Sequence, residues 1–170
     1  KSRKMKSLTL SFLFVLFLFS VQAQENFGVK VYEGKEKIPT YQKGPDETSP
    51  LFFTGRGVQG TSGHIYPYPA QTNLSDTLTM ETYDMVYLEN KYLKVTILPA
   101  FGGKLYSAID KTNGHELFHR NSVIKPDLIG TLGAWISGGI EWCFPNHHRT
   151  TTLLPADYGI EQNEDGSATV

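Results

Sequence analysis

The sequence has one cysteine, no excess of positive charge and no long helical periodicity. Cys143 stands alone, so a disulfide within the chain is excluded. Sixteen Lys and Arg residues face 17 Asp and Glu residues, a formal net charge of −1. Without a basic excess, nucleic acid is not an expected partner. With 39% hydrophobic and 19% charged residues, the bulk of the chain is neither disordered nor a membrane bundle, and 170 residues suit at most one domain.

The first 23 residues have the layout of a secretory signal peptide. Lys1–Lys6 is basic, Leu8–Val21 is an almost unbroken apolar run, and Val21 and Ala23 put small side chains at the −3 and −1 positions of a cleavage site. The run is too short for a transmembrane helix, which needs about 20 apolar residues. We expect a secreted or periplasmic protein, cleaved after Ala23 and not spanning the membrane afterwards. Met5 is an alternative start.

The body of the chain is expected to be all-β. Glycine and proline recur too often for a helix of ordinary length, beginning with Gly34, Pro39 and Gly44. Short runs of alternating or β-branched residues predict strands instead, separated by Asn- and Gly-containing turns. The Gly-rich run 129–140 predicts a loop packed closely on a neighbour. The expected strands are residues 29–32, 83–89, 92–98, 104–109, 116–119, 156–162 and 169–170, with turns at 89–91, 110–114 and 163–166.

Several stretches resemble the opening of the galactose mutarotase-like, or aldose 1-epimerase-like, supersandwich. The hairpin 87–99, the Gly102-Gly103-Lys104-Leu105 run and the turn 110–114 carry this resemblance. More narrowly, the chain is similar to a secreted bacterial domain of unknown function with that fold, often followed by tetratricopeptide repeats. The narrower likeness extends from about Val29 to Val170. It is carried by residues 38–41, 59–60, 66–69, 123–126 and, most specifically, 135–141 and 147–149.

The resemblance implies the N-terminal part of a β-supersandwich. We expect a signal peptide over 1–23, an extended N-terminal arm over 24–80 and the leading strands over 81–170. A strand that begins at Thr169 has no later partner, so the sandwich is expected to be truncated and incomplete. Protein partners would then contact the absent C-terminal region. Lys104 departs from the family, because an Arg with a planar bidentate fork is common there.

Residues 138–149 gather the groups that recognise sugars. Aromatic rings pack against the C–H faces of a sugar, and fixed donors and acceptors bind its hydroxyls. Mutarotation needs one base and one acid, and imidazole titrates near working pH. We therefore expect Glu141, His147 and His148 to be catalytic, and Arg149, Trp142 and Asn146 to bind a carbohydrate ligand.

Each assignment has a structural alternative. Glu141 could satisfy buried backbone N–H groups of the Gly-rich loop, and Trp142 could belong to the core. Cys143, between two aromatic residues, is interpreted as a core thiol rather than a nucleophile. His147 and His148 could join Glu141 on zinc. Adjacent residues of an extended strand point to opposite faces, however, so no metal is predicted, and no cofactor.

Catalysis itself is left open by the sequence. In true aldose 1-epimerases the base is a Glu late in the chain, a part this sequence does not contain. Glycoside cleavage needs two carboxylates, and no clear second one accompanies Glu141. The expected function is a secreted carbohydrate-binding or carbohydrate-processing protein. The alternative is a non-catalytic β-sandwich scaffold or interaction module of the cell envelope.

Overall fold

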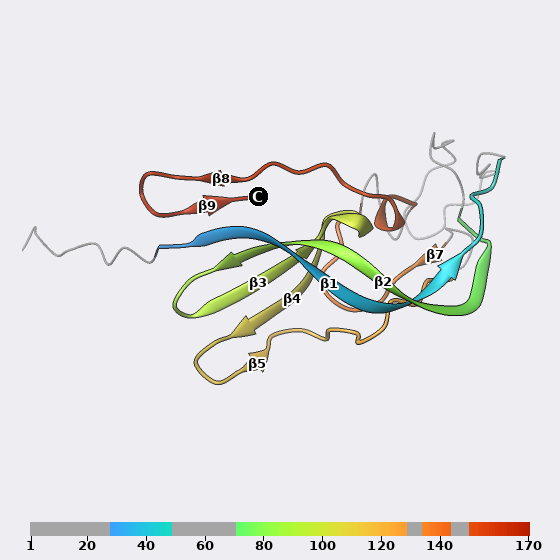
Figure 1. The fold of residues 1–170 in the computed structure, drawn as a ribbon, viewed down its shortest axis with the longest axis horizontal. Coiled ribbons are helices and arrows are strands. Elements are labelled where there is room, and N and C mark those ends of the chain that lie inside the picture. The colour runs from blue at the N-terminus through green and yellow to red at the C-terminus, as the bar shows by residue number, and fades with distance from the viewer. Residues whose placement is uncertain (1–27, 49–70, 129–133, 144–149) are drawn as a thin grey trace, which may run out of the picture.

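The computed structural model describes residues 28–48, 71–128, 134–143 and 150–170, and their regular structure is β-strand apart from two short 3-10 helices (Figure 1). The all-β class is confirmed. A five-stranded antiparallel sheet follows the order β1-β2-β3-β4-β5, with two further two-stranded ladders, β6-β7 and β8-β9. The strands are β1 Lys30–Lys43, β2 Leu74–Glu89, β3 Leu93–Leu98, β4 Lys104–Asp110, β5 His115–Glu116, β6 Asp127–Leu128, β7 Ala134–Trp135, β8 Glu161–Gln162 and β9 Ala168–Thr169, with 3-10 turns η1 Pro99–Phe101 and η2 Thr150–Leu153.

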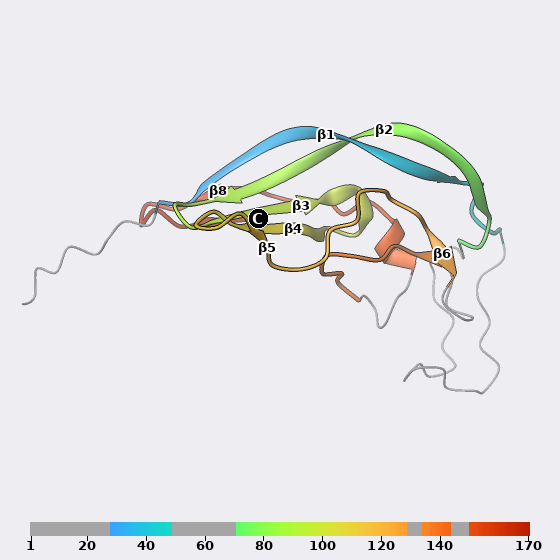
Figure 2. The ribbon, with the colours of Figure 1, turned by 90° about the horizontal axis from the view of Figure 1, so that it is seen from below.

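Strands β1 and β2 are much longer than the predicted strands 29–32 and 83–89 and pair along almost their whole length. No helix forms around Gly34 and Pro39, as expected, but the strand continues through both residues. Figure 2 shows them as one long bowed ribbon. The carbonyl of Pro39 accepts a hydrogen bond from Ile124 N–H (2.9 Å) at the outer edge of β1. The N–H that proline lacks would point to that same edge, so the β1–β2 ladder loses nothing. At Gly34, a Cβ would lie 2.9 Å from Cε2 of Tyr87, so glycine lets that ring approach.

The turn between β2 and β3 confirms the predicted hairpin. Asn90 Oδ1 accepts the backbone N–H groups of Tyr92 and Leu93, both at 2.8 Å, which fixes the turn. The predicted strand over 156–162 is too long, because only Glu161–Gln162 joins a ladder there. The predicted division at residue 80 falls inside β2, which runs without interruption from Leu74 to Glu89.

One face of the sheet carries the main core. Met85 and Leu98 are fully buried, and Tyr87 and Tyr106 nearly so. Tyr83, Met85 and Tyr87 alternate along β2 and therefore share this face, since Tyr83 packs against the same cluster. Ile38, Ile124, Ala134, Ile136 and Leu153 complete this cluster.

The opposite face, here called the second face, is also apolar. Glu33, Val86, Ile97, Leu105 and Ile140 lie directly opposite one another across neighbouring segments, so their side chains share this face. Val86 is fully buried, whereas Ile140 is 43% exposed. A sheet that is apolar on both sides needs cover on both. The cover on the second face is incomplete.

The segment 154–170 crosses the second face and is tied down at several points. Gly102 N–H donates to the carbonyl of Leu154 (2.7 Å), and Ala156 N–H donates to that of Pro99 (2.9 Å). At the far end, Val29 N–H donates to the carbonyl of Gly166 (2.8 Å), so the β8–β9 hairpin lies alongside β1 (Figure 1). Within the described ranges, no helix is long and apolar enough to cross a bilayer.

Candidate functional site

A glycine turn brings the predicted site to the edge of β4. Gly138 and Gly139 both have positive φ (82° and 64°). Leu105 N–H donates to the carbonyl of Ile140 (3.0 Å), and Ile140 N–H donates to that of Leu105 (2.9 Å). A Cβ on Gly139 would lie 2.4 Å from the Leu105 carbonyl oxygen, so only glycine allows this approach. The expectation of a closely packed Gly-rich loop is confirmed for these two residues.

Lys104 joins the glycine turn to β4 on the core face. Its side chain is buried, and Nζ donates to the carbonyls of Gly138 (2.6 Å) and Ile136 (3.3 Å). Burial lowers the pKa of Lys104, and the nearby Glu141 carboxyl and Cys143 thiol oppose that shift. A lysine thus serves here as a point donor to carbonyls, a role that does not use the planar fork of an arginine.

Glu141 and Cys143 lie together near Lys104. Cys143 Sγ donates to Glu141 Oε1 at 3.3 Å. Cys143 is exposed, so the interpretation of a core thiol is wrong: the chain leaves the sheet edge after Ile140, and no described segment covers it. Desolvation and then the hydrogen bond to Glu141 raise the pKa of the Cys143 thiol, the opposite of what activates a nucleophile.

We expect Lys104→Met to destabilise the fold by about 1–3 kcal/mol, because two buried carbonyls lose their donor. The substitution should also remove the part of the pH dependence of stability that Lys104 causes. The folded pKa of Lys104 is below its unfolded value, so the unfolded chain binds more protons in that window and stability rises with pH toward the ordinary lysine range. Urea unfolding at several pH values checks both effects. Exposed Lys125, changed to Met, is the control; an equal loss there would contradict the prediction.

Trp142 lies away from this cluster, on the second face. Its indole is 55% exposed, so the alternative that placed it in the core is wrong. Indole Nε1–H donates to the carbonyl of Gly103 at 2.8 Å, which fixes the ring over the turn between η1 and β4. The ring forms one wall of a hollow of about 450 Å³, here called the Trp142 hollow. Its other walls are Ile97, Pro99, Gly102, Gly103, Leu105, Ala156, Asp157, Tyr158, Gly159 and Val170.

Tyr158 also lines the hollow and is anchored to the sheet. Its phenol donates to Glu33 Oε1 at 2.5 Å, and this hydrogen bond raises the pKa of Tyr158. The ring remains 42% exposed. Asp157 is exposed and is the only carboxylate among the described residues that line the hollow. The hollow therefore offers two aromatic rings, an apolar floor and one acid.

The structure describes two of the six predicted site residues and separates them. Trp142 lines the hollow, whereas Glu141 is not among its walls. The alternation expected of an extended segment, with Glu141 and Cys143 on one side and Trp142 on the other, fits this arrangement. The described ranges hold no group of three His, Cys, Asp or Glu side chains able to bind a metal ion. The other predicted residues, Asn146, His147, His148 and Arg149, lie outside the described residues.

Sequence reasoning missed Lys104 and Tyr158. The sequence shows Lys104 only as a departure from a common Arg, and its acceptors lie far along the chain. Tyr158 gives no local signal, because its role depends on where the segment 154–170 crosses the sheet.

Residues 61–170 match the model of a family described as a domain of unknown function, DUF5107. The chain belongs to this family. The DUF5107 chain is also similar to the crystal structure of a TPR-domain containing protein from Parabacteroides distasonis ATCC 8503, with a TM-score of 0.67 and 31% identity. The match covers 81% of this chain and 23% of that one, so the chain spans less than a quarter of that relative's length. Both findings agree with the expected domain of unknown function found beside tetratricopeptide repeats.

Proposed function

We propose that this DUF5107 chain belongs to a carbohydrate-binding or carbohydrate-processing protein and that a saccharide binds in the Trp142 hollow. The observation that carries the proposal is the pair of exposed rings, Trp142 and Tyr158, beside the carboxylate of Asp157 in a hollow of about 450 Å³. Ligand pockets commonly have about 300–1,000 Å³ and combine apolar walls with a few fixed polar groups.

The chemistry of the hollow suits a sugar ring. A sugar presents C–H groups on its faces and hydroxyls around its edge. The indole and the phenol ring can pack against the C–H faces, while the Asp157 carboxylate accepts hydroxyl protons. Trp142 is held by Gly103 and Tyr158 by Glu33, so both rings are positioned before a ligand arrives, which reduces the entropy lost on binding.

The proposal includes the mutarotase-like architecture and export from the cell. The mutarotase-like likeness is supported by the sequence stretches that carry it and by an antiparallel sheet that is apolar on both faces. Export is supported by the basic segment Lys1–Lys6 and the apolar run Leu8–Val21. Mass measurement of the mature protein tests export, and a mass that still includes residues 1–23 would contradict it.

We expect Trp142→Ala to weaken saccharide binding about tenfold, because the variant loses an aromatic wall of the hollow. Calorimetric titration of the full-length protein against a panel of neutral glycans measures the effect. Trp142→Phe, which keeps a ring but loses the hydrogen bond to Gly103, should lose less. Met80→Ala, at a side chain 60% exposed on β2, is the control. The proposal fails if no glycan binds, or if the Met80 variant weakens binding as much.

Two of the predicted catalytic residues belong to the same proposal. His147 and His148 would supply the acid and the base, and Arg149 and Asn146 would bind hydroxyls, whereas Glu141, predicted to be catalytic, is not among the walls of the hollow and has no part in this proposal. Arg149→Ala in the same titration tests the contribution of that part of the chain. Unchanged binding in this variant would assign the saccharide to the walls of the hollow alone.

A second candidate is a non-catalytic interaction module of the cell envelope. It is favoured by the similarity to a TPR-domain containing protein, of which this chain matches only 23%. Binding of a partner protein that survives Trp142→Ala, together with no glycan binding, would favour this second candidate.

A further inference from the structure

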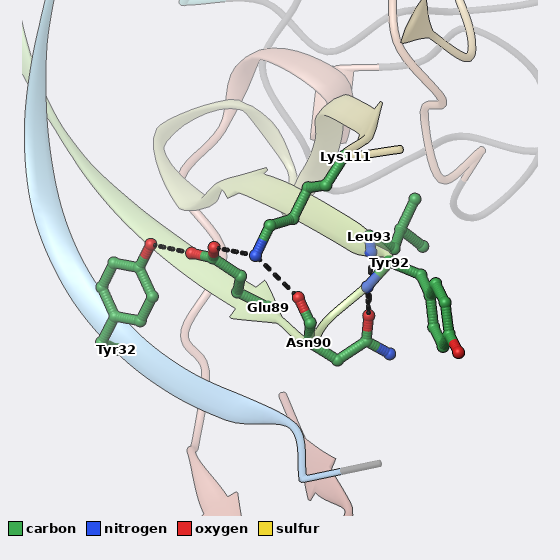
Figure 3. A network of polar contacts seen from close by, with 6 residues as sticks. All are labelled: Tyr32, Glu89, Asn90, Tyr92, Leu93 and Lys111. Atoms are coloured by element: carbon green, nitrogen blue, oxygen red, sulfur yellow. Dashed lines mark hydrogen bonds and ion pairs between the residues drawn. The ribbon is translucent and has the colours of Figure 1, made fainter. Parts of the chain in front are cut away.

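Four lysines surround a single carboxylate at the end of the sheet near the β2–β3 turn. Glu89 on β2 lies directly opposite Lys30 on β1 and Lys94 on β3, so the three side chains share one face. Lys111, just after β4, places Nζ 2.6 Å from Glu89 Oε1 (Figure 3). Lys91 occupies the turn itself. Together these side chains carry a formal charge of +3.

Three of these lysines line a small hollow, here called the basic hollow. It has a volume of about 260 Å³ and is lined by Gly28, Lys30, Glu89, Asn90, Lys91 and Lys111. Glu89 is the only acid among these walls, so the lining carries +2. The chain beyond residue 23 has 12 basic and 17 acidic residues. The basic hollow is thus a positively charged site in a part of the chain that carries a net negative charge.

The carboxylate of Glu89 is fully engaged and does not neutralise the other lysines. Oε1 accepts from Lys111 (2.6 Å), and Oε2 accepts from the Tyr32 phenol (2.7 Å). These two hydrogen bonds lower the pKa of Glu89, so it stays ionised and holds Lys111 in place. Lys111 also donates to the carbonyl of Asn90 (2.8 Å), as Figure 3 shows.

The remaining two lysines of the lining are available to a ligand. Lys91 Nζ lies 5.2 Å from the ring centroid of Tyr92, a contact that leaves its charge uncompensated. Neither Lys30 nor Lys91 forms a salt bridge among the described residues, and both are exposed. Lys94 adds a fourth charge nearby, with Nζ 4.6 Å from the ring centroid of Tyr87.

We propose that the basic hollow binds an oxyanion group, a carboxylate, sulfate or phosphate, carried by a small ligand or by one residue of a polymer. Ammonium groups from β1, the β2–β3 turn and the end of β4 line one concave site, where a single anion can contact more than one of them. The site lies on the core face of the sheet, opposite the Trp142 hollow, and is independent of the saccharide proposed there.

The test is calorimetric titration of the full-length chain at low salt with sodium sulfate, inorganic phosphate and sodium acetate, three oxyanions that carry no sugar ring. We expect the oxyanions to bind, and we expect added sodium chloride to lower their affinity. Lys30→Gln with Lys91→Gln should weaken binding about 25-fold, about fivefold for each charge removed. The order of affinities among the three oxyanions assigns the preferred group.

Three variants make the outcome decisive. The double variant Lys30→Arg with Lys91→Arg keeps both charges and should retain binding. This result would show that the Gln variant loses binding through lost charge and not through a folding defect. Lys37→Gln removes an exposed lysine of β1 from the opposite face and should change nothing. Trp142→Ala should also leave oxyanion binding unchanged. The inference is overturned if no oxyanion binds or if Lys37→Gln weakens binding equally.

Discussion

Gly139→Ala is expected to destabilise the protein by at least about 3 kcal/mol. The new Cβ would lie 2.4 Å from the Leu105 carbonyl oxygen, a contact that only a backbone shift can relieve. That shift would break the pair of hydrogen bonds between Leu105 and Ile140 and the bond from Gly139 N–H to the His119 carbonyl (2.8 Å). The positive φ adds about 1–2 kcal/mol for any residue with a Cβ. Urea unfolding followed by circular dichroism measures the loss.

Two other glycines separate these contributions. Gly114 has a φ of 74° but no atom within 4 Å of an added Cβ, so Gly114→Ala should show the conformational cost alone, about 1 kcal/mol. Gly159 has open space and no positive φ, so Gly159→Ala should be neutral or slightly stabilising. If Gly139→Ala costs no more than Gly114→Ala, the close approach to Leu105 does not govern this part of the fold.

Alkaline pH is expected to unfold the protein partly through Tyr87. Its phenol donates to Glu36 Oε1 at 2.9 Å, and burial, then this carboxylate, raises the pKa of Tyr87 to about 12. The ordinary tyrosine value is 10.0, so between the two values the folded chain keeps a proton that the unfolded chain has lost. The contribution of Tyr87 to the free energy of unfolding is therefore fully present below pH 10. It is lost as the pH rises toward 12, by up to about 3 kcal/mol.

Tyr87→Phe should be less stable at neutral pH, because the hydrogen bond to Glu36 is lost, but should lose stability less steeply above pH 10. Tyr32, whose pKa a hydrogen bond to Glu89 raises to about 12, retains part of the slope in both proteins. Unfolding at a series of pH values and the ultraviolet absorbance of tyrosinate check the prediction. Glu36→Gln should lower the pKa at which Tyr87 titrates. An identical slope in wild type and Tyr87→Phe would contradict it.

The sequence predicted the parts of the fold that local pattern decides. Alternation in β2 places Met85 and Tyr87 in the core, and the turn at Asn90 follows from an amide side chain that accepts nearby N–H groups. The length of β1 was not predictable in this way. Gly34 and Pro39 are breakers by local preference, and only the ring of Tyr87 and the bond from Ile124 explain why they are tolerated.

The candidate site was predicted in composition but not in arrangement. The exposure of Trp142 and Cys143 follows from the bridge between Leu105 and Ile140, which joins segments far apart in the sequence. No periodicity within residues 138–149 contains that information. Tyr158 and Asp157 reach the Trp142 hollow only because the segment 154–170 crosses the second face, a tertiary contact that local sequence does not encode.

The long β1–β2 ladder also predicts an order of folding. Strand β3 pairs with β2 only over Val86–Glu89, so the stretch Leu74–Glu81 has its ladder partner in β1 alone. The β2–β3–β4 meander is joined by short loops. The connection between β1 and β2 is much longer, so β1 must close a larger loop before it can pair with β2. Docking of β1 and ordering of the first half of β2 should thus form one late, slow step, visible as amides that gain protection from exchange together.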